Sequence, residues 1–164
     1  MLGARSMTIY SYCRTSELEA SLEQDELDAI LEPEMLAIQT YCLRQSWFMT
    51  ETLNDSNCNW NHDFGRRDSG RRLMSLLAPG DVILCSKLER ICSSSHEVIK
   101  LVQELKEMSV QLHVVELRGD ITDVELSVNF AKVTELFSAL EKRKSAERIK
   151  GVKQLQRKQG RYLG

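Results

Sequence analysis

The chain has 164 residues, 42% of them hydrophobic, which is enough to build one compact core but not two full domains. Its formal net charge is −2, from 22 basic and 24 acidic residues. The longest apolar runs, such as Val82–Cys85, are far too short to cross a bilayer, so we expect no membrane span and no membrane partner.

The charged residues are distributed unevenly along the chain. Residues 17–35 contain eight acidic residues and no basic one, whereas residues 141–164 contain nine Lys or Arg and two Glu. The basic end is therefore the candidate for contact with nucleic acid. The five cysteines show no C-x-x-C spacing and no leader precedes them, so we expect reduced thiols in a cytoplasmic protein.

The first third of the chain predicts a strand followed by helices. Residues 8–13 alternate and are rich in β-forming side chains, as in a first strand. Residues 17–32 have apolar side chains at roughly helical spacing, and this acidic helix or ordered loop is expected to stop before Pro33. A second helix is expected over residues 34–46.

The middle of the chain predicts two further strands separated by a loop and a short helix. A strand is expected at residues 47–53, and a mobile loop rich in Asn, Asp and Gly at residues 54–67. A short helix follows near residues 70–77. Pro79-Gly80 then forms a turn before residues 81–86, a continuous apolar run typical of a strand buried on both faces of a parallel sheet.

The last third predicts one more helix and strand before a long final helix. Residues 96–108 carry an apolar stripe and residues 111–115 form a strand, after which Arg118-Gly119-Asp120 is expected to be a turn. Apolar residues then recur at three- and four-residue steps in a helix that ends in basic charge, at Leu126, Phe130, Val133, Phe137 and Leu140.

Together these elements predict an α/β fold with a mostly parallel central sheet flanked by helices and followed by a long C-terminal helix. We expect residues 1–120 to form the α/β core and residues 121–164 to form the helix and basic tail. The apolar stripe is either ordinary core or a dimer interface, and we favour dimerisation because such a long helix outruns its own domain.

Arg14 and Ser16 are the first candidates for chemistry. If the first strand extends that far, its period of two places both side chains on one side, at the carboxyl end where open α/β sheets bind ligands. A hydroxyl beside a guanidinium suits attack on a phosphodiester. However, Ser16 to Glu19 is also a capping box, so Ser16 either attacks a phosphate or begins a helix.

Three segments resemble the catalytic domain of serine recombinases of the resolvase and invertase class. Tyr12–Ser16 resembles the family's Tyr-Ala-Arg-Val-Ser, in which the serine is the nucleophile, and Leu36–Gln39 is similar to the helix that follows it. From Arg67 through Pro79–Leu84 to Lys87–Arg90, the chain resembles the family's Arg-Pro stretch, Gly-Asp strand and Leu-Asp-Arg-Leu-x-Arg motif. The order and spacing of these segments carry the resemblance.

The resemblance implies that DNA is cut by Ser16, which becomes joined to a 5′ phosphate, and that the ends are resealed after subunit exchange in a tetramer of two dimers. It implies that Arg14, Arg67 and Arg90 contact the scissile phosphate, with supporting residues Gln39, Asp81 and Glu89. No metal or other cofactor is expected, because fixed cations supply the charge stabilisation. The long helix would pass from the dimer interface onto DNA through Lys142, Arg143, Lys144, Arg148, Lys150 and Lys153.

Several residues depart from the family's pattern. Ser93 stands where the family has a second arginine, and a hydroxyl cannot replace a guanidinium at a phosphate. Glu89 replaces an aspartate and Asp68 a proline. About a dozen extra, mostly acidic residues lie between Ser16 and Gln39, where they would repel DNA phosphates.

Three readings of function therefore remain open. The first is a recombinase that cuts and rejoins DNA, and the second is a catalytically impaired recombinase-like protein that binds DNA or regulates. The third is an unrelated phosphate-binding α/β protein. The family's separate helix-turn-helix DNA-binding domain is expected to be absent from these 164 residues. The basic tail can also be only a solvated helix face, and Cys58 with His62 is too small a set for a metal site.

Overall fold

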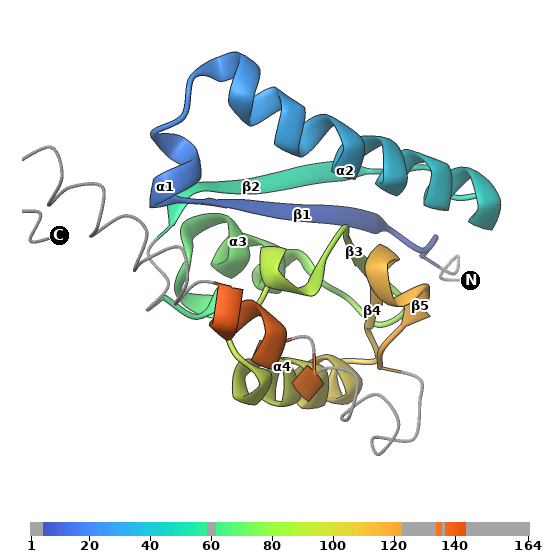
Figure 1. The fold of residues 1–164 in the computed structure, drawn as a ribbon. Coiled ribbons are helices and arrows are strands. Elements are labelled where there is room, and N and C mark those ends of the chain that lie inside the picture. The colour runs from blue at the N-terminus through green and yellow to red at the C-terminus, as the bar shows by residue number, and fades with distance from the viewer. Residues whose placement is uncertain (1–4, 59–61, 123–133, 136, 144–164) are drawn as a thin grey trace, which may run out of the picture. The chain divides into compact units, whose positions relative to one another are not determined.

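The computed structural model describes residues 5–58, 62–122, 134–135 and 137–143. The chain separates into two compact units, Met1–Val124 and Glu125–Gly164, and the sheet belongs to the first. The elements of this unit are, in chain order, β1 Ile9–Ser16, α1 Glu17–Ala20, α2 Gln24–Gln45, β2 Glu51–Cys58, α3 Asp68–Leu76, β3 Val82–Cys85, α4 Ser95–Glu107, β4 Gln111–Val114 and β5 Gly119–Asp120 (Figure 1).

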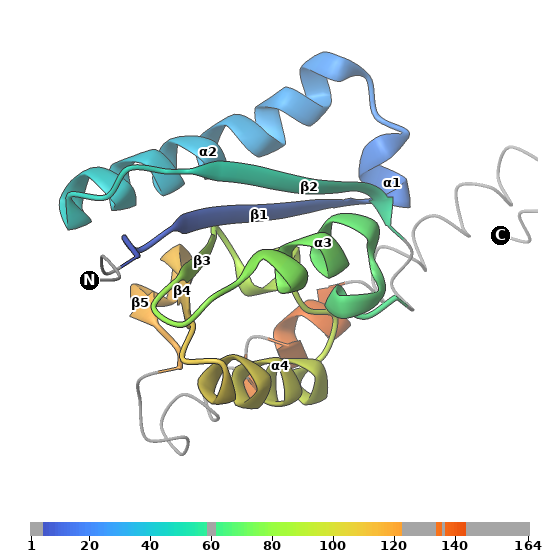
Figure 2. The same ribbon diagram turned by 180° about the vertical axis from the view of Figure 1, so that it is seen from behind.

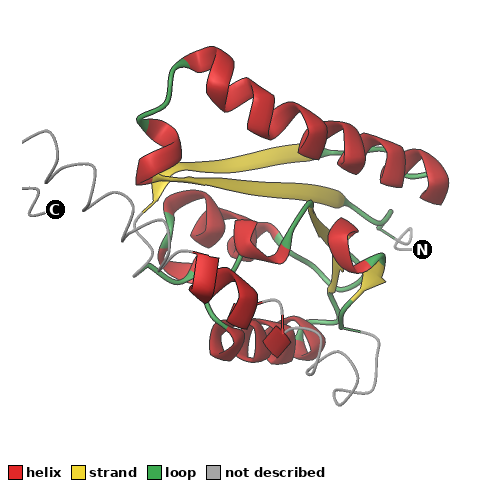
Figure 3. Cartoon of the chain, in the orientation of Figure 1, coloured by secondary structure: helices red, strands yellow, loops and turns green. Residues whose placement is uncertain are grey.

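The strands form one sheet in the order β2-β1-β3-β4-β5. The first four are parallel to one another, and β5 alone runs antiparallel, beside β4. Helix α2 lies along one face of the sheet, and α3 and α4 lie on the other, as the two opposite views show (Figures 1 and 2). The predicted α/β class with a mostly parallel sheet between helices is therefore confirmed (Figure 3).

The core is centred on β3, whose four residues are all buried. Tyr12, Leu73, Leu105 and Leu112 are fully buried around it, with no measurable exposure of their side chains to solvent. Burying an apolar side chain of this size stabilises a fold by about 1.5–3 kcal/mol relative to leaving it exposed. The continuous apolar run is the sequence feature that predicted this strand, and the structure confirms its central place.

The predicted helix end before Pro33 is wrong. Helix α2 runs through Pro33 without a break, and the separate element before it, α1, is a single turn that ends at Ala20. A proline inside a helix removes the hydrogen bond to the residue four positions earlier, but it does not prevent the neighbouring turns from forming. Here the next residue, Glu34, is buried in ion pairs with Arg90 and Lys87, which hold this part of α2 in place.

The second strand lies later in the chain than predicted, because β2 begins at Glu51 and extends into the expected loop as far as Cys58. Its Leu53 and Asp55 are buried while the residue between them is exposed, which is the alternation of a strand even though one of the two is charged. The predicted turn at 118–120 is also partly wrong. Only Arg118 has the left-handed conformation of a turn, with φ of 62°, and the next two residues form β5.

The predicted final helix falls mostly outside the described residues. Residues 134–135 and 137–143 are helical, and they include Phe137, Leu140, Lys142 and Arg143. The other predicted interface and DNA-contacting residues lie outside the described ranges, namely Leu126, Phe130, Val133, Lys144, Arg148, Lys150 and Lys153. Within the part of the chain that is described, no helix combines the length and the apolar character that a membrane span needs.

Candidate active site

Ser16 lies at the point where β1 ends and α1 begins. Its hydroxyl oxygen accepts a hydrogen bond from the Glu19 amide at 3.1 Å, and its own amide donates to the Glu19 carboxylate at 3.0 Å. This reciprocal pair is a capping box, as one of the two predictions for Ser16 required. The residue nevertheless stands at the carboxyl end of a parallel strand, which is the position that the other prediction required.

Arg90 lies beside Ser16 and is buried between two carboxylates. Its Nη1 donates to both oxygens of Glu19 at 2.9 Å, and its Nε donates to Glu34 at 2.9 and 3.3 Å. Nη1 also donates to the carbonyl of Arg14 at 3.1 Å, which ties the guanidinium to the end of β1. One carboxylate, that of Glu19, thus bonds at once to the backbone of Ser16 and to the side chain of Arg90.

The charges around Arg90 balance one another. Burial disfavours the charged guanidinium, but attraction to Glu34 and the hydrogen bonds that Arg90 donates to both carboxylates outweigh this and raise the pKa of Arg90. Burial likewise acts to raise the pKa of Glu19, yet the Ser16 amide and Arg90 hold that pKa below its ordinary value. Lys87 pairs with Glu34 at 3.5 Å, so two cations face two anions.

Arg14 reaches the loop that follows β3. Its Nε donates to the carbonyl of Glu89 at 2.8 Å, and its two terminal nitrogens lie 3.3 Å from the Ser93 hydroxyl and 3.5 Å from the Cys92 carbonyl. These three acceptors are neutral. Burial, and then the positive charge of Arg67, lower the pKa of Arg14. The acceptors that Arg14 reaches in this loop are thus neutral, while the carboxylate of Glu97 acts on it by charge and partly offsets these effects.

Arg67, the residue that precedes α3, contacts the same loop. Its Nη1 donates to the Ile91 carbonyl at 2.8 Å and to the Tyr12 hydroxyl at 3.3 Å. Its Nη2 is buried and makes no hydrogen bond among the described residues, although it lies 3.7 Å from the carboxylate of Glu97. A guanidinium with one unsatisfied donor keeps hydrogen-bonding capacity for an anion.

Asp55 of β2 is connected to Arg67 through the hydroxyl of Tyr12. It accepts hydrogen bonds from the Tyr12 hydroxyl at 2.7 Å and from the first amides of α3, at Ser69 and Gly70, at 2.8 and 3.0 Å. Burial raises the pKa of Tyr12, so its phenol stays protonated and donates to the carboxylate. Gly70 is required here because a Cβ would collide with the carbonyl of Phe64.

The loop at 88–93 is thus the meeting point of the three predicted arginines. Arg90 belongs to it, and Arg14 and Arg67 each donate to its backbone carbonyls. Several fixed guanidinium groups beside a serine can stabilise the charge that develops on a phosphoryl group under attack. Burial raises the pKa of the nearby Cys13 to about 11, so this thiol stays protonated at neutral pH and does not compete as a nucleophile.

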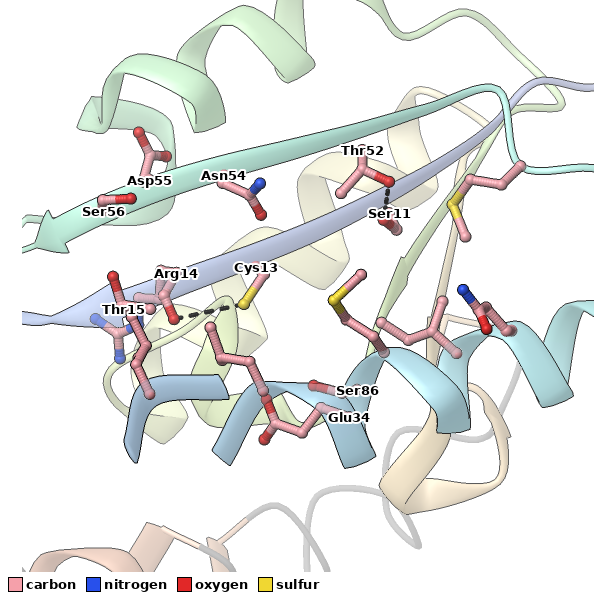
Figure 4. A pocket seen from close by; sticks show the side chains of 16 residues that line it. Ser11, Cys13, Arg14, Thr15, Glu34, Thr52, Asn54, Asp55, Ser56 and Ser86 are labelled. Carbon is pink, nitrogen blue, oxygen red and sulfur yellow. Dashed lines mark hydrogen bonds between the residues drawn. The ribbon is translucent and has the colours of Figure 1, made fainter. Parts of the chain in front are cut away.

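A cavity of about 270 Å³ separates α2 from β1 and β2 beside this cluster. Figure 4 shows Cys13, Arg14, Thr15 and Glu34 along its wall. By the roughly 30 Å³ that a water molecule takes up in the liquid, the space is large enough for several waters. The ion pairs of Glu34 therefore lie next to a space that can hold water.

The structure does not bring the other three predicted catalytic side chains to Ser16 in the same way. Asp81 lies at the opposite end of the sheet, before β3, where it accepts the Thr8 and Ala78 amides at 3.1 and 2.8 Å. Gln39 is exposed on α2 and lines the cavity, five residues beyond Glu34. Glu89 takes part through its backbone carbonyl, which accepts from Arg14.

Four site residues escaped sequence reasoning: Glu19, Glu34, Asp55 and Glu97. Glu19 was predicted only as the capping-box partner of Ser16, not as a partner of Arg90, and nothing in the acidic segment distinguishes Glu34 from its exposed neighbours. Asp55 carried a usable signal, since it falls on the buried register of β2. The described ranges contain no cluster of three or more His, Cys, Asp or Glu side chains that could hold a metal ion.

The family model "Resolvase, N terminal domain" matches residues 9–162. A search of curated proteins finds no match. Among solved structures, the chain is similar to a resolvase family site-specific recombinase from Streptococcus pneumoniae, at 16% identity and a TM-score of 0.55 over 93% of this chain and 98% of that one.

A second similar structure is the N-terminal catalytic domain of TP901-1 integrase. It is 16% identical, with a TM-score of 0.54 over 85% of this chain and 97% of that one. At such low identity these two structures support the fold alone. The family model covers nearly the whole chain, and on that match the chain belongs to the resolvase family of serine recombinases, as a divergent N-terminal domain.

Proposed function

We propose that this domain cuts and rejoins DNA through a phosphoserine intermediate on Ser16. The observation that supports this proposal best is the convergence at the carboxyl end of β1. There the Glu19 carboxylate bonds to both the Ser16 amide and the Arg90 side chain. Arg14 and Arg67 bind the loop that carries Arg90. This combines one nucleophile with three cations, which can stabilise the charge of phosphoryl transfer without a metal.

In the proposed step, the Ser16 oxygen attacks a backbone phosphorus atom of DNA. The new bond joins that oxygen to phosphorus, and the bond from phosphorus to the 3′ oxygen breaks, so that the serine proton is lost and the 3′ oxygen gains one. Arginine donors stabilise the extra negative charge on the phosphoryl oxygens in between. Rejoining is the same exchange in reverse, with a 3′ hydroxyl as the attacking group.

The proposal includes DNA and a second copy of the chain as partners. Basic residues of the C-terminal segment, such as Arg148 and Lys153, would neutralise phosphates, and the apolar stripe that includes Phe137 would form the dimer. Reversing the charge of Arg148 and Lys153 should weaken DNA binding at every sequence and flatten its salt dependence. Unchanged binding and salt dependence would leave this segment as a solvated helix face.

The direct experiment incubates the domain with supercoiled or nicked DNA and isolates protein bound covalently to a 5′ end. Ser16→Ala should abolish the adduct. Ser21→Ala is the matched control, because Ser21 is also a serine at the end of α1 but its hydroxyl donates to the Leu18 carbonyl, at 2.6 Å. An adduct that survives in Ser16→Ala would overturn the assignment of the nucleophile.

A second candidate function is DNA binding without cleavage, and the position of Ser93 favours it. The Ser93 hydroxyl accepts from Arg14 at a place where the family resemblance implies another arginine. Lys87, one candidate to replace that cation, is paired with Glu34. Loss of one phosphate-directed donor costs about 3 kcal/mol in the transition state, or about a hundredfold in rate.

Ser93→Arg distinguishes the two candidates. On the enzymatic proposal this substitution should increase the Ser16 adduct, since it restores a cation beside the phosphate. If neither the unmodified domain nor the variant forms an adduct while both bind DNA, the non-catalytic candidate is correct. Strong cleavage by the unmodified domain that Ser93→Arg leaves unchanged would show that this position is not limiting.

A further inference from the structure

The acidic segment places two carboxylates on Arg90, and their surroundings differ. Glu34 lies within the 22-residue helix α2, with a side chain only 9% exposed, and it is shared with Lys87. Glu19 lies in the single turn of α1, which contains no buried residue, and its side chain is 19% exposed. Glu34 is thus held by a long helix, whereas Glu19 is held mainly by its own polar contacts.

The contacts of Glu19 are those that a phosphate group would make. A carboxylate and a phosphodiester both present two oxygens that share one negative charge, and a guanidinium pairs with either. The Glu19 carboxylate accepts from the Arg90 guanidinium with both oxygens and from the amide of the proposed nucleophile, Ser16. The backbone amide of Glu19 also donates a hydrogen bond to the Ser16 hydroxyl oxygen.

The charge balance also leaves no place for a third anion. Arg90 and Lys87 are matched by Glu19 and Glu34, so a DNA phosphate that approached this cluster would meet two carboxylates already in contact with the cations. Like charges at such distances repel strongly when they are partly buried. A phosphate that pairs with Arg90 through Nε or Nη1 would therefore compete with one of these carboxylates.

We infer that Glu19 is an internal substitute for the scissile phosphate, which closes the site until DNA displaces α1, and that Glu34 is a positioning residue that holds Arg90 throughout. This inference rests on the proposed function and concerns its regulation. Displacement requires the loss of one helical turn that buries no side chain. It also frees the Ser16 hydroxyl from its role as a helix cap, so that one movement exposes the nucleophile and the cation together.

Inorganic phosphate is a suitable probe, because it tests the site without DNA cleavage. Its binding can be followed by NMR at the backbone amides of Ser16 and Glu19, which separates this site from the basic tail. Glu19→Gln should tighten phosphate binding by about tenfold, since it removes the competing charge. Glu34→Gln should weaken it, since Arg90 loses its anchor.

Glu17→Gln is the matched control. Glu17 lies in the same turn of α1 and is exposed, so the substitution changes the net charge equally without touching the contacts of Arg90. If Glu17→Gln and Glu19→Gln tighten phosphate binding equally, the effect comes from net charge alone and the inference is overturned. A gain in Glu34→Gln as large as that in Glu19→Gln would overturn it too, because the two glutamates would then play the same part.

The Ser16 adduct assay separates this inference from the proposed function. If Glu19→Gln tightens phosphate binding but no variant forms an adduct, the closure stands and the proposed chemistry fails. If the unmodified domain forms the adduct and Glu19→Gln changes neither phosphate binding nor the adduct yield, the chemistry stands and the closure fails. Circular dichroism of each variant shows whether the domain remains folded.

Discussion

The two ends of the α1–α2 segment are attached to the domain by different forces. At the carboxyl end, the ring of His113 contacts Tyr41 and Trp47, and the Tyr41 hydroxyl lies 2.7 Å from its Nδ1. Ile38 and Cys42 pack there against Leu84 of β3. Toward the amino end, from α1 to the middle of α2, the attachment includes the ion pairs of Glu19 and Glu34 with Arg90 and that of Glu34 with Lys87.

This difference shows how one segment can be both fixed and releasable. A dissolved anion does not weaken aromatic and apolar packing, because the free energy of that packing comes from the exclusion of water. An ion pair can be exchanged for another ion pair at small net cost when a competing anion of similar geometry arrives. The acidic end lies over the proposed nucleophile, and the aromatic end lies far along α2 from it.

The largest effect on stability is expected when Arg90, the cation bound by Glu19 and Glu34, is removed. Arg90→Met leaves Glu19 and Glu34 partly or fully buried without their common partner, and this should lower the free energy of unfolding by about 3–5 kcal/mol. Urea denaturation measures the change. A loss below about 1 kcal/mol would show that the pairs behave like exposed salt bridges and that water already reaches them.

A smaller effect is expected at the aromatic end. His113→Ala removes the ring contacts and the hydrogen bonds to Tyr41 and Gln111, and the free energy of unfolding should fall by about 2–3 kcal/mol. Phosphate binding at Ser16 should not change, since this end does not reach the site. If the variant binds phosphate as tightly as Glu19→Gln does, the two ends are coupled and the comparison is wrong.

The smallest effect concerns pH. Although burial acts to raise it, the pKa of Glu19 lies below its ordinary value because of the Ser16 amide and the charge of Arg90. Ionised Glu19 therefore stabilises the fold above the unfolded-state pKa, and this contribution disappears as the pH falls through the lower folded-state value. Urea denaturation across the acidic range should show a shallower loss of stability in Glu19→Gln than in the unmodified domain. Parallel curves would show that Glu19 is not coupled to Arg90.

The fold could be predicted from the sequence where the signal is local. The apolar run of β3 and the turn before it placed the central strand, and the period of two together with strand polarity placed Arg14 and Ser16 at the carboxyl end of β1. Pro33 misled the prediction because the constraint that keeps α2 continuous is long-range. It is the burial of Glu34 against Arg90, 56 residues away in the sequence.

The site shows the same division between local and long-range information. The capping box of Ser16 was legible because both partners lie within four residues. The pairing of Glu19 and Glu34 with Arg90 was not, since a 19-residue segment with eight acidic residues looks like a solvated face and only tertiary pairing selects two of them. Asp81 was placed in the site by resemblance, and its backbone contacts at the start of β3 show that it stabilises the other end of the sheet.

Hydrogen exchange with and without phosphate tests the central claim most directly. The amides of Ser21 and Leu22 report on α1, since they donate to the Leu18 and Glu19 carbonyls at 3.1 Å, and the Trp47 amide reports on the far end of α2, where it donates to the Cys42 carbonyl at 2.9 Å. If phosphate replaces Glu19 on Arg90, exchange at Ser21 and Leu22 should accelerate several-fold while exchange at Trp47 stays the same. Slower exchange in α1, or equal acceleration at both ends, would contradict a site that is closed by one displaceable turn.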